Sequence, residues 1–195
     1  MKLVPLLAAA ALSAALLPAP RAGDAGRAPQ AGGAARDIRP ADTPCDLPAY
    51  VADPDPRGLN VRSGPGTPFP VVGVIPHKGG SAVGLTVTGS SGPWVRIKDA
   101  AVQEDGEAVF GGEGWVFAGM LATETKNYSA RDPRALVVKL YASPSLRSRV
   151  VTRLPSEMEV RLAGCKGGWA QVRSGKATGW LDPESQCAST LTTCS

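Results

Sequence analysis

GLNVRSGPGTPFPVVGVIP, residues 58–76, joins two short apolar runs through a turn rich in Gly and Pro. In the first run, Leu59-Asn60-Val61-Arg62, apolar and polar residues alternate, which is the pattern of a half-buried β-strand. The second run, residues 71–75, is rich in Val and Ile, and these β-branched residues favour strands. Pro65 and the neighbouring glycines suit a turn between them. The stretch therefore predicts a strand, a turn and a second strand.

The same pattern occurs twice in the chain. Residues 61–76 align without a gap on residues 140–155, at a constant offset of 79 residues. Further along, Trp94-Val95-Arg96-Ile97 is matched by Trp169-Ala170-Gln171-Val172, and Gly114-Trp115-Val116 is matched by Gly179-Trp180-Leu181. Both copies keep one order of short strands separated by turn residues, and no sustained helical period follows the N-terminal run. The sequence predicts an all-β protein with two similar small domains.

This ordered set of motifs resembles the bacterial SH3-like (SH3b) domain family. The resemblance spans residues 50–187 and is clearer in the first copy, because the second has Lys139 and Tyr141 in the places of Asn60 and Arg62. It implies an all-β fold of two small SH3-like antiparallel barrels in tandem. Members of the family occur in envelope and cell-wall proteins, often beside peptidoglycan-cleaving enzymes, where they contribute binding or targeting.

The N-terminus has the features of a secretory signal, with Lys2 before an uncharged run rich in Leu and Ala that is too short for a convincing membrane span. We therefore expect a periplasmic or secreted protein without stable membrane insertion after cleavage. The expected division is a signal peptide at 1–22, a disordered leader at 23–44, a first domain at 45–121, a linker at 122–134 and a second domain with a C-terminal tail at 135–195. Only the first copy carries the acidic segment 98–113, which forms either a long hairpin loop or an extra β-ribbon.

The four cysteines are Cys45, Cys165, Cys187 and Cys194. An even number in an exported protein of small domains indicates disulfides. None of them forms a C-x-x-C pair, so zinc binding and thioredoxin chemistry are poorly supported. Because a small barrel brings the ends of its strands together, we favour the pairs Cys165–Cys187 and Cys45–Cys194, the second clasping the two termini. The sequence leaves the other pairings open.

The charge balance does not predict a nucleic-acid partner. The formal net charge is +4, and Lys2 and Arg21 would leave with the signal peptide. The remaining excess of basic over acidic residues is too small to predict binding along a nucleic-acid backbone. Arg147, Arg149 and Arg153 are the nearest approach to a basic cluster, and a solvated strand face explains them equally well.

The residues needed for catalysis are largely missing. His77 is the one histidine and lies in a turn-like context, and four cysteines in disulfides leave no nucleophile for a Cys–His peptidase. One histidine does not make a usual zinc site. The paired carboxylates that a glycosidase would need are found in loop-like sequence, at Asp53, Asp55, Glu104 and Asp105. We expect no catalytic residue, no metal and no cofactor, and therefore no enzyme.

Aromatic side chains are the best candidates for a binding surface, because they stack on sugars and on apolar side chains. The candidate ligand contacts are Asn60, Arg62, Trp94 and Trp115 in the first copy, and Tyr141, Trp169 and Trp180 in the second. Each Trp can also be a core residue, above all Trp115 and Trp180, which follow a glycine. The expected function is a non-catalytic module that binds cell-wall peptidoglycan or an envelope peptide. The alternative is a structural adaptor that binds another envelope protein through residues 98–113.

Overall fold

The regular elements of this protein are almost all β-strands. A computed structural model describes residues 42–126 and 137–191. Within these residues the chain forms strands and two single-turn 3₁₀-helices, so the all-β prediction is confirmed. The expected signal peptide lies outside the described residues, as does the expected leader up to residue 41.

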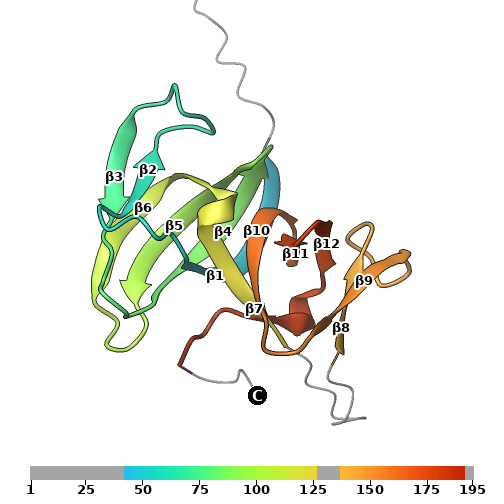
Figure 1. The fold of residues 1–195 in the computed structure, drawn as a ribbon. Helices are drawn as coiled ribbons and strands as arrows, with labels where there is room; N and C mark the ends of the chain where they lie inside the picture. The colour runs from blue at the N-terminus through green and yellow to red at the C-terminus, as the bar shows by residue number, and fades with distance from the viewer. Residues whose placement is uncertain (1–41, 127–136, 192–195) are drawn as a thin grey trace, which may run out of the picture. The chain divides into compact units, whose positions relative to one another are not determined.

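The first module opens with a single strand, continues with a β-hairpin and then forms a three-stranded meander (Figure 1). Arg62 of the hairpin pairs with Trp115 of the meander, which closes the module. A short 3₁₀-helix follows the meander and leads into a last strand. The elements are β1 (Thr43–Val51), β2 (Leu59–Arg62), β3 (Val71–Ile75), β4 (Val83–Ser91), β5 (Trp94–Val102), β6 (Ala108–Phe117), η1 (Ala118–Met120) and β7 (Leu121–Thr125).

The second module repeats this order from the hairpin onward, and its described residues include no counterpart of β1. Its elements are β8 (Val137–Tyr141), β9 (Val150–Pro155), β10 (Glu159–Lys166), β11 (Trp169–Ser174), β12 (Ala177–Leu181), η2 (Pro183–Ser185) and β13 (Gln186–Cys187). A bulge is repeated as well, because the register of β4 with β5 slips at Thr88 and that of β10 with β11 slips at Ala163. The prediction of two copies is confirmed.

Strand β7 belongs to both modules. It pairs with β1 through Tyr50 and Ala122, and with β10 through Thr123 and Val160. Strand β13 of the second module also pairs with β7. The linker expected at 122–134 is therefore wrong for residues 122–125, which form a strand inside one continuous sheet. The rest of that linker, from residue 127, lies outside the described residues.

Two threonines of β7 are buried and fully hydrogen-bonded, which is why a polar-looking segment can lie in the interior. Thr123 Oγ1 donates to the Cys187 carbonyl oxygen at 2.9 Å. Thr125 Oγ1 donates to the Pro155 carbonyl oxygen at 2.7 Å and accepts from the Met158 N–H at 3.0 Å. Buried polar groups persist where such partners exist. Residues of the second module thus hold the last strand of the first.

Replacing Thr125 by Val is expected to lower the free energy of unfolding by about 1–3 kcal/mol, because the Met158 N–H and the Pro155 carbonyl would lose a buried partner. Thr86→Val on β4 is the matched control. Thr86 is half-buried and its hydroxyl has no hydrogen-bond partner within the described residues, so this change should be close to neutral. Urea denaturation measures both variants. Equal losses would contradict a special role for the Thr125 hydroxyl.

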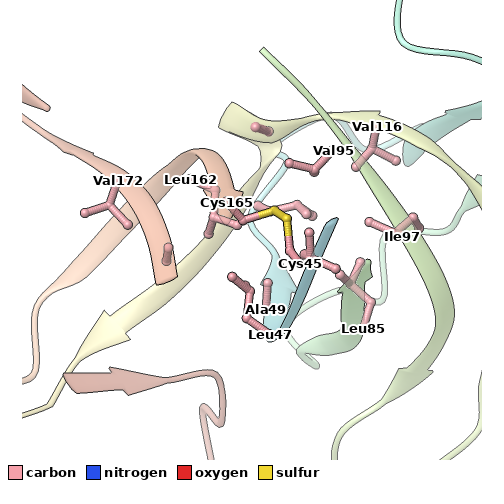
Figure 2. Packing of buried hydrophobic residues seen from close by; sticks show 14 of the residues in the cluster. Cys45, Leu47, Ala49, Leu85, Val95, Ile97, Val116, Leu162, Cys165 and Val172 are labelled. Carbon is pink, nitrogen blue, oxygen red and sulfur yellow. A yellow bond between two sulfur atoms is a disulfide. The ribbon is translucent and has the colours of Figure 1, made fainter. Parts of the chain in front are cut away.

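The buried apolar cluster extends through both modules. Val61, Ile97 and Val116 of the first module are completely buried, as are Leu140 and Leu162 of the second. Figure 2 shows Cys45 and Cys165 among these side chains, between Leu162 of β10 and the residues of β1. Burial of apolar surface is the main stabilising term in a domain of this size. The two modules therefore share a core as well as a sheet.

The acidic segment of the first copy is a β-ribbon, the second of the two forms expected for it. Strands β5 and β6 extend past the barrel to Val102 and Ala108, and their turn exposes Glu104, Asp105 and Glu107. The Gln103 amide nitrogen donates to the Ala188 carbonyl oxygen at 2.6 Å. This bond attaches the ribbon to the segment that follows β13.

Candidate functional site

A disulfide links β1 to the second module. Cys45 is bonded to Cys165, which lies 120 residues further along the chain, with the two Cα atoms 5.8 Å apart. Both favoured pairs, Cys165–Cys187 and Cys45–Cys194, are therefore wrong. The reason is that the start of β1 runs alongside the end of β10, where Cys45 forms a β-bridge with Gly167. Cys187 is also disulfide-bonded, and no cysteine is free within the described residues. Cys194 lies outside them.

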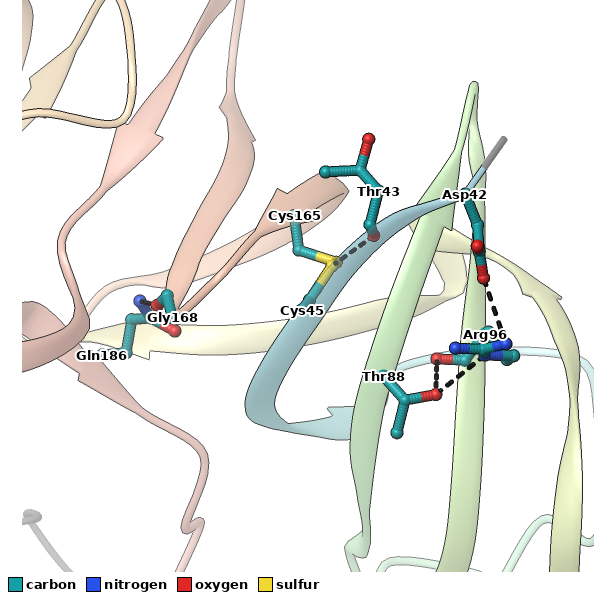
Figure 3. Close-up of a disulfide and its surroundings, with 8 residues drawn as sticks. All are labelled: Asp42, Thr43, Cys45, Thr88, Arg96, Cys165, Gly168 and Gln186. Atoms are coloured by element: carbon teal, nitrogen blue, oxygen red, sulfur yellow. Dashed lines mark hydrogen bonds and ion pairs between the residues drawn. A yellow bond between two sulfur atoms is a disulfide. The ribbon is translucent and has the colours of Figure 1, made fainter. Parts of the chain in front are cut away.

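Backbone hydrogen bonds fix the start of β1 against the turn between β10 and β11. The Asp46 N–H donates to the Gly167 carbonyl oxygen at 3.0 Å, and the Gly167 N–H donates to the Pro44 carbonyl oxygen at 2.9 Å. On the other side of this turn, Gln186 Nε2 donates to the Gly168 carbonyl oxygen at 2.8 Å (Figure 3). Residues 43–44 were expected to belong to the disordered leader, and they are instead the first residues of β1.

A surface cavity of about 410 Å³ lies at this junction. Its lining residues come from β1, from the turn between β8 and β9 and from the turn between β10 and β11, and they are Thr43, Pro44, Pro144, Lys166, Gly167 and Trp169. Most of the lining is apolar, and the exposed Lys166 is its one charged residue. We call it the Trp169 pocket. The sequence pointed to Trp169 alone, because Pro44 and Lys166 are brought there by the fold.

Trp169 is held in place by a second aromatic residue. The rings of Tyr141 and Trp169 meet edge to face, with centroids 5.8 Å apart and an interplanar angle of 83°. Tyr141 is buried at 8% exposure, whereas Trp169 is only half-buried. Burial, followed by the nearby charge of Asp182, raises the pKa of the Tyr141 hydroxyl, so Tyr141 is neutral at physiological pH. This edge-to-face contact with a buried ring favours the observed orientation of the Trp169 ring.

The other predicted tryptophans have different surroundings. Trp94 is half-buried and packs edge to face against Phe117, with centroids 6.0 Å apart. Trp115 is buried at 8% exposure, as expected for a core residue. Trp180 is half-buried on β12, where it pairs with Tyr141 across the strands. Only Trp169 of these four lines the pocket described above.

Arg62 stabilises its own turn. Its Nη1 donates to the carbonyl oxygens of Thr67 and Phe69, at 3.1 and 2.8 Å. In the second module this position is Tyr141, and the turn is held instead by the Ser148 hydroxyl, which accepts from the Ser143 N–H at 3.0 Å. This exchange explains why the second copy can lack the arginine.

Asn60 is exposed on β2, between buried residues of the same strand. Its ligand contact, like that of Arg62, stays a prediction. Both residues belong to the first module, whereas the lining of the Trp169 pocket comes from β1 and the second module.

The titratable side chains that the sequence offered for catalysis lie in turns and loops of the described chain. His77 is exposed, and its Nδ1 accepts from the Gly79 N–H at 3.2 Å. Hydrogen bonds from Arg57 lower the pKa of the Asp55 carboxyl to about 2, which makes it a poor proton donor. The described residues contain no group of three His, Cys, Asp or Glu side chains placed to hold a metal. Nor does this part of the chain have a helix long and apolar enough to cross a membrane.

Comparisons with known proteins agree with the modular fold. A family model described as bacterial SH3 domain matches residues 57–122 and 136–185, which together make up more than half of the chain. No curated protein matches. Among solved structures, NlpC1 and NlpC2 from Trichomonas vaginalis each align with a TM-score of 0.28 and 10% identity. The alignments cover 73% and 72% of this chain but only 46% and 47% of those proteins, and similarity this low carries no argument about activity.

Proposed function

Because this chain belongs to the bacterial SH3 domain family, we propose that it is a non-catalytic binding module of the cell envelope. Its ligand is peptidoglycan or an envelope peptide, and the main contact is the Trp169 pocket of the second module. The observation that carries this proposal is a half-buried Trp ring, in edge-to-face contact with Tyr141, that lines a cavity of about 410 Å³. Ligand pockets combine apolar walls with a few polar groups in this way.

The chemistry of the pocket suits a ligand with a flat apolar face and a negative charge. A sugar ring or an apolar side chain would stack on Trp169 between the two prolines, Pro44 and Pro144. The exposed ammonium of Lys166 would attract a carboxylate beside that face. Because Tyr141 already fixes the Trp ring, binding would cost little side-chain entropy.

The disulfides support a location outside the cytoplasm. Bonds such as Cys45–Cys165 persist in oxidising compartments and are rare in the bacterial cytosol. Together with the signal-like N-terminus, this supports a periplasmic or secreted protein. Detecting the mature chain in the periplasmic or culture fraction, and its retention in the cytoplasm after deletion of residues 1–22, would test that location.

Trp169→Ala is expected to abolish most retention of the protein on purified insoluble peptidoglycan, with at least a tenfold loss of apparent affinity. The full protein is used with its disulfides intact, and circular dichroism verifies folding. Trp94→Ala is the matched control, since Trp94 opens the equivalent strand and also packs edge to face on an aromatic ring, that of Phe117. Its retention should be close to that of the unmodified protein.

Two outcomes would count against the proposed site. If Trp94→Ala lost retention and Trp169→Ala kept it, the binding copy would be the first one. If the unmodified protein were not retained above a non-binding control, the wall-binding proposal would fail.

The second candidate function is the structural adaptor that binds another envelope protein. The observation that favours it lies at a surface other than the expected residues 98–113, the edge strand β3, on which Val71, Val72 and Val74 are 45%, 55% and 44% exposed. Exposed apolar residues on an uncovered strand edge are typical of a protein interface. Chemical cross-linking in cell envelopes, with Val72→Lys as the variant that should lose the product, tests this candidate.

A further inference from the structure

The two modules carry opposite charge. Residues 42–126 contain six Lys and Arg against ten Asp and Glu, a formal charge of −4. Residues 137–191 contain eight Lys and Arg against four Asp and Glu, a formal charge of +4. The small net charge of the whole chain hides this asymmetry. The second module therefore attracts anions although the protein as a whole hardly does.

The positive charge is concentrated on the hairpin of β8 and β9. Lys139 and Arg153 stand directly opposite each other in the ladder, and both are exposed. Arg147 and Arg149 lie at the turn end of the same hairpin, where the Ala142 N–H donates to the Arg149 carbonyl oxygen at 2.8 Å. Within the described residues none of these four cations has an ion pair, whereas four other cations do.

Two like charges that face each other on adjacent strands, with no acidic partner, destabilise the sheet. One structural explanation is edge protection, since β9 is the last strand of the sheet and charges on an edge prevent aggregation. The opposite edge of the same sheet argues against this explanation. Strand β3 has the equivalent position in the first module and exposes three valines, with no charge between Val71 and Ile75. The fold therefore tolerates an uncharged edge, and the cations of β8 and β9 call for another reason.

The arrangement of donors fits phosphate groups repeated along a chain. The rungs at Lys139 and at Arg149 are three residues apart, about 10 Å along the hairpin, so the four cations are spread along its length instead of being gathered at one point. One guanidinium group can donate two hydrogen bonds at once to two oxygens of the same phosphate. The hydroxyls of Ser145 and Ser148 accept bonds from backbone N–H groups, which leaves their own protons to donate. Phosphate has several acceptor oxygens and can therefore accept hydrogen bonds from guanidinium, ammonium and hydroxyl groups together.

We propose that the β8–β9 hairpin of the second module is a docking surface for a linear, phosphate-bearing polymer of the cell envelope. This inference goes beyond the proposed function, because its cations do not line the Trp169 pocket. Pro144 belongs to the same turn and does line it, so the two surfaces adjoin. A polymer on the hairpin would hold the second module against the envelope while the pocket binds a separate group.

Long-chain inorganic polyphosphate is the probe, with neutral dextran as the uncharged comparison. The full protein, with disulfides intact, should bind polyphosphate at 50 mM salt and should lose about a hundredfold in affinity at 300 mM salt. It should not bind dextran. K139E/R153E should lose at least tenfold in affinity. The matched control R57E/K98E makes the same change in net charge on the first module, at two exposed cations, and should bind as the unmodified protein does.

Three results would overturn the proposal: no binding of the unmodified protein, equal losses in both double variants, or tighter binding of duplex DNA than of polyphosphate. K139Q/R153Q removes the two charges without reversing them, so it is less disruptive to folding than K139E/R153E. It should also bind polyphosphate more weakly than the unmodified protein does. Trp169→Ala should bind polyphosphate normally while losing peptidoglycan retention. K139E/R153E should retain its binding to peptidoglycan that has been stripped of attached polymers. The two proposals can thus fail independently.

Discussion

Removing the Cys45–Cys165 bond by changing both residues to Ala is expected to lower the free energy of unfolding by about 5 kcal/mol. The bond closes a loop of 120 residues, and the chain-entropy model gives about 4.7 kcal/mol for a loop of 100 residues. The stabilisation comes mainly from restricting the unfolded chain. Its size is comparable to the whole stability of many domains, so the double variant should be partly unfolded at 37 °C.

Guanidinium denaturation followed by tryptophan fluorescence measures this loss. The double Ser variant is the control for packing, since Cys45 and Cys165 are 9% and 3% exposed and the smaller side chains leave small voids. Both double variants lack the same cross-link and should lose similar amounts. A loss below about 1 kcal/mol in both would contradict the chain-entropy account.

The same bond should matter for binding, because one wall of the Trp169 pocket is the start of β1. Pro44 is next to Cys45 in the chain, and its carbonyl is fixed by the Gly167 N–H. Without the disulfide, the first residues of β1 have only backbone bonds to keep them at the pocket. At a temperature where the reduced protein is still folded, reduction of the bond should therefore weaken ligand binding.

The sequence predicted the local part of the fold well. Alternation in Leu59-Asn60-Val61-Arg62 and the ordered repeat gave the strands of both copies, because strand and turn preferences depend on neighbouring residues. The contrast between the two turns was visible as well, since Arg62 is replaced by Tyr141. The structure adds what each side chain does, with Arg62 bonded to its turn and Tyr141 packed on Trp169.

The contacts between modules could not be predicted in this way. Strand β7 was interpreted as a linker because Thr123, Glu124 and Thr125 are polar, and their partners lie in the other module. The disulfide pairs are wrong for a similar reason, since the contact between Cys45 and Gly167 joins two segments from different modules. The Trp169 pocket draws Pro44 and Lys166 from segments more than 100 residues apart. Nothing in the local pattern of either segment indicates the other.

Replacing Gly114 by Ala is expected to lower the free energy of unfolding by about 3 kcal/mol, the upper end for overpacking in a closely packed core. A Cβ atom at this position would lie 2.2 Å from Val61 Cγ1 and 3.1 Å from the Arg62 carbonyl oxygen. Val61 is completely buried, so its side chain could give way only by displacing other residues of the packed core. Gly179 holds the equivalent place in the second module, where a Cβ would lie 2.9 Å from Leu140 Cβ. The glycine before each Trp therefore lets the meander pack directly against the hairpin.

Gly111 provides the matched control on the same strand. A Cβ there would have no atom within 4 Å, and its φ angle is not positive. Gly111→Ala should be neutral or stabilise by up to about 1 kcal/mol, since alanine has less freedom to lose on folding. Urea denaturation of the two variants gives the difference directly. If Gly114→Ala and Gly111→Ala had the same free energy of unfolding, Gly114 would not be needed for the close approach of β6 to β2. A large difference would show that the Gly-Trp motif marks packing between strands rather than a ligand contact at Trp115.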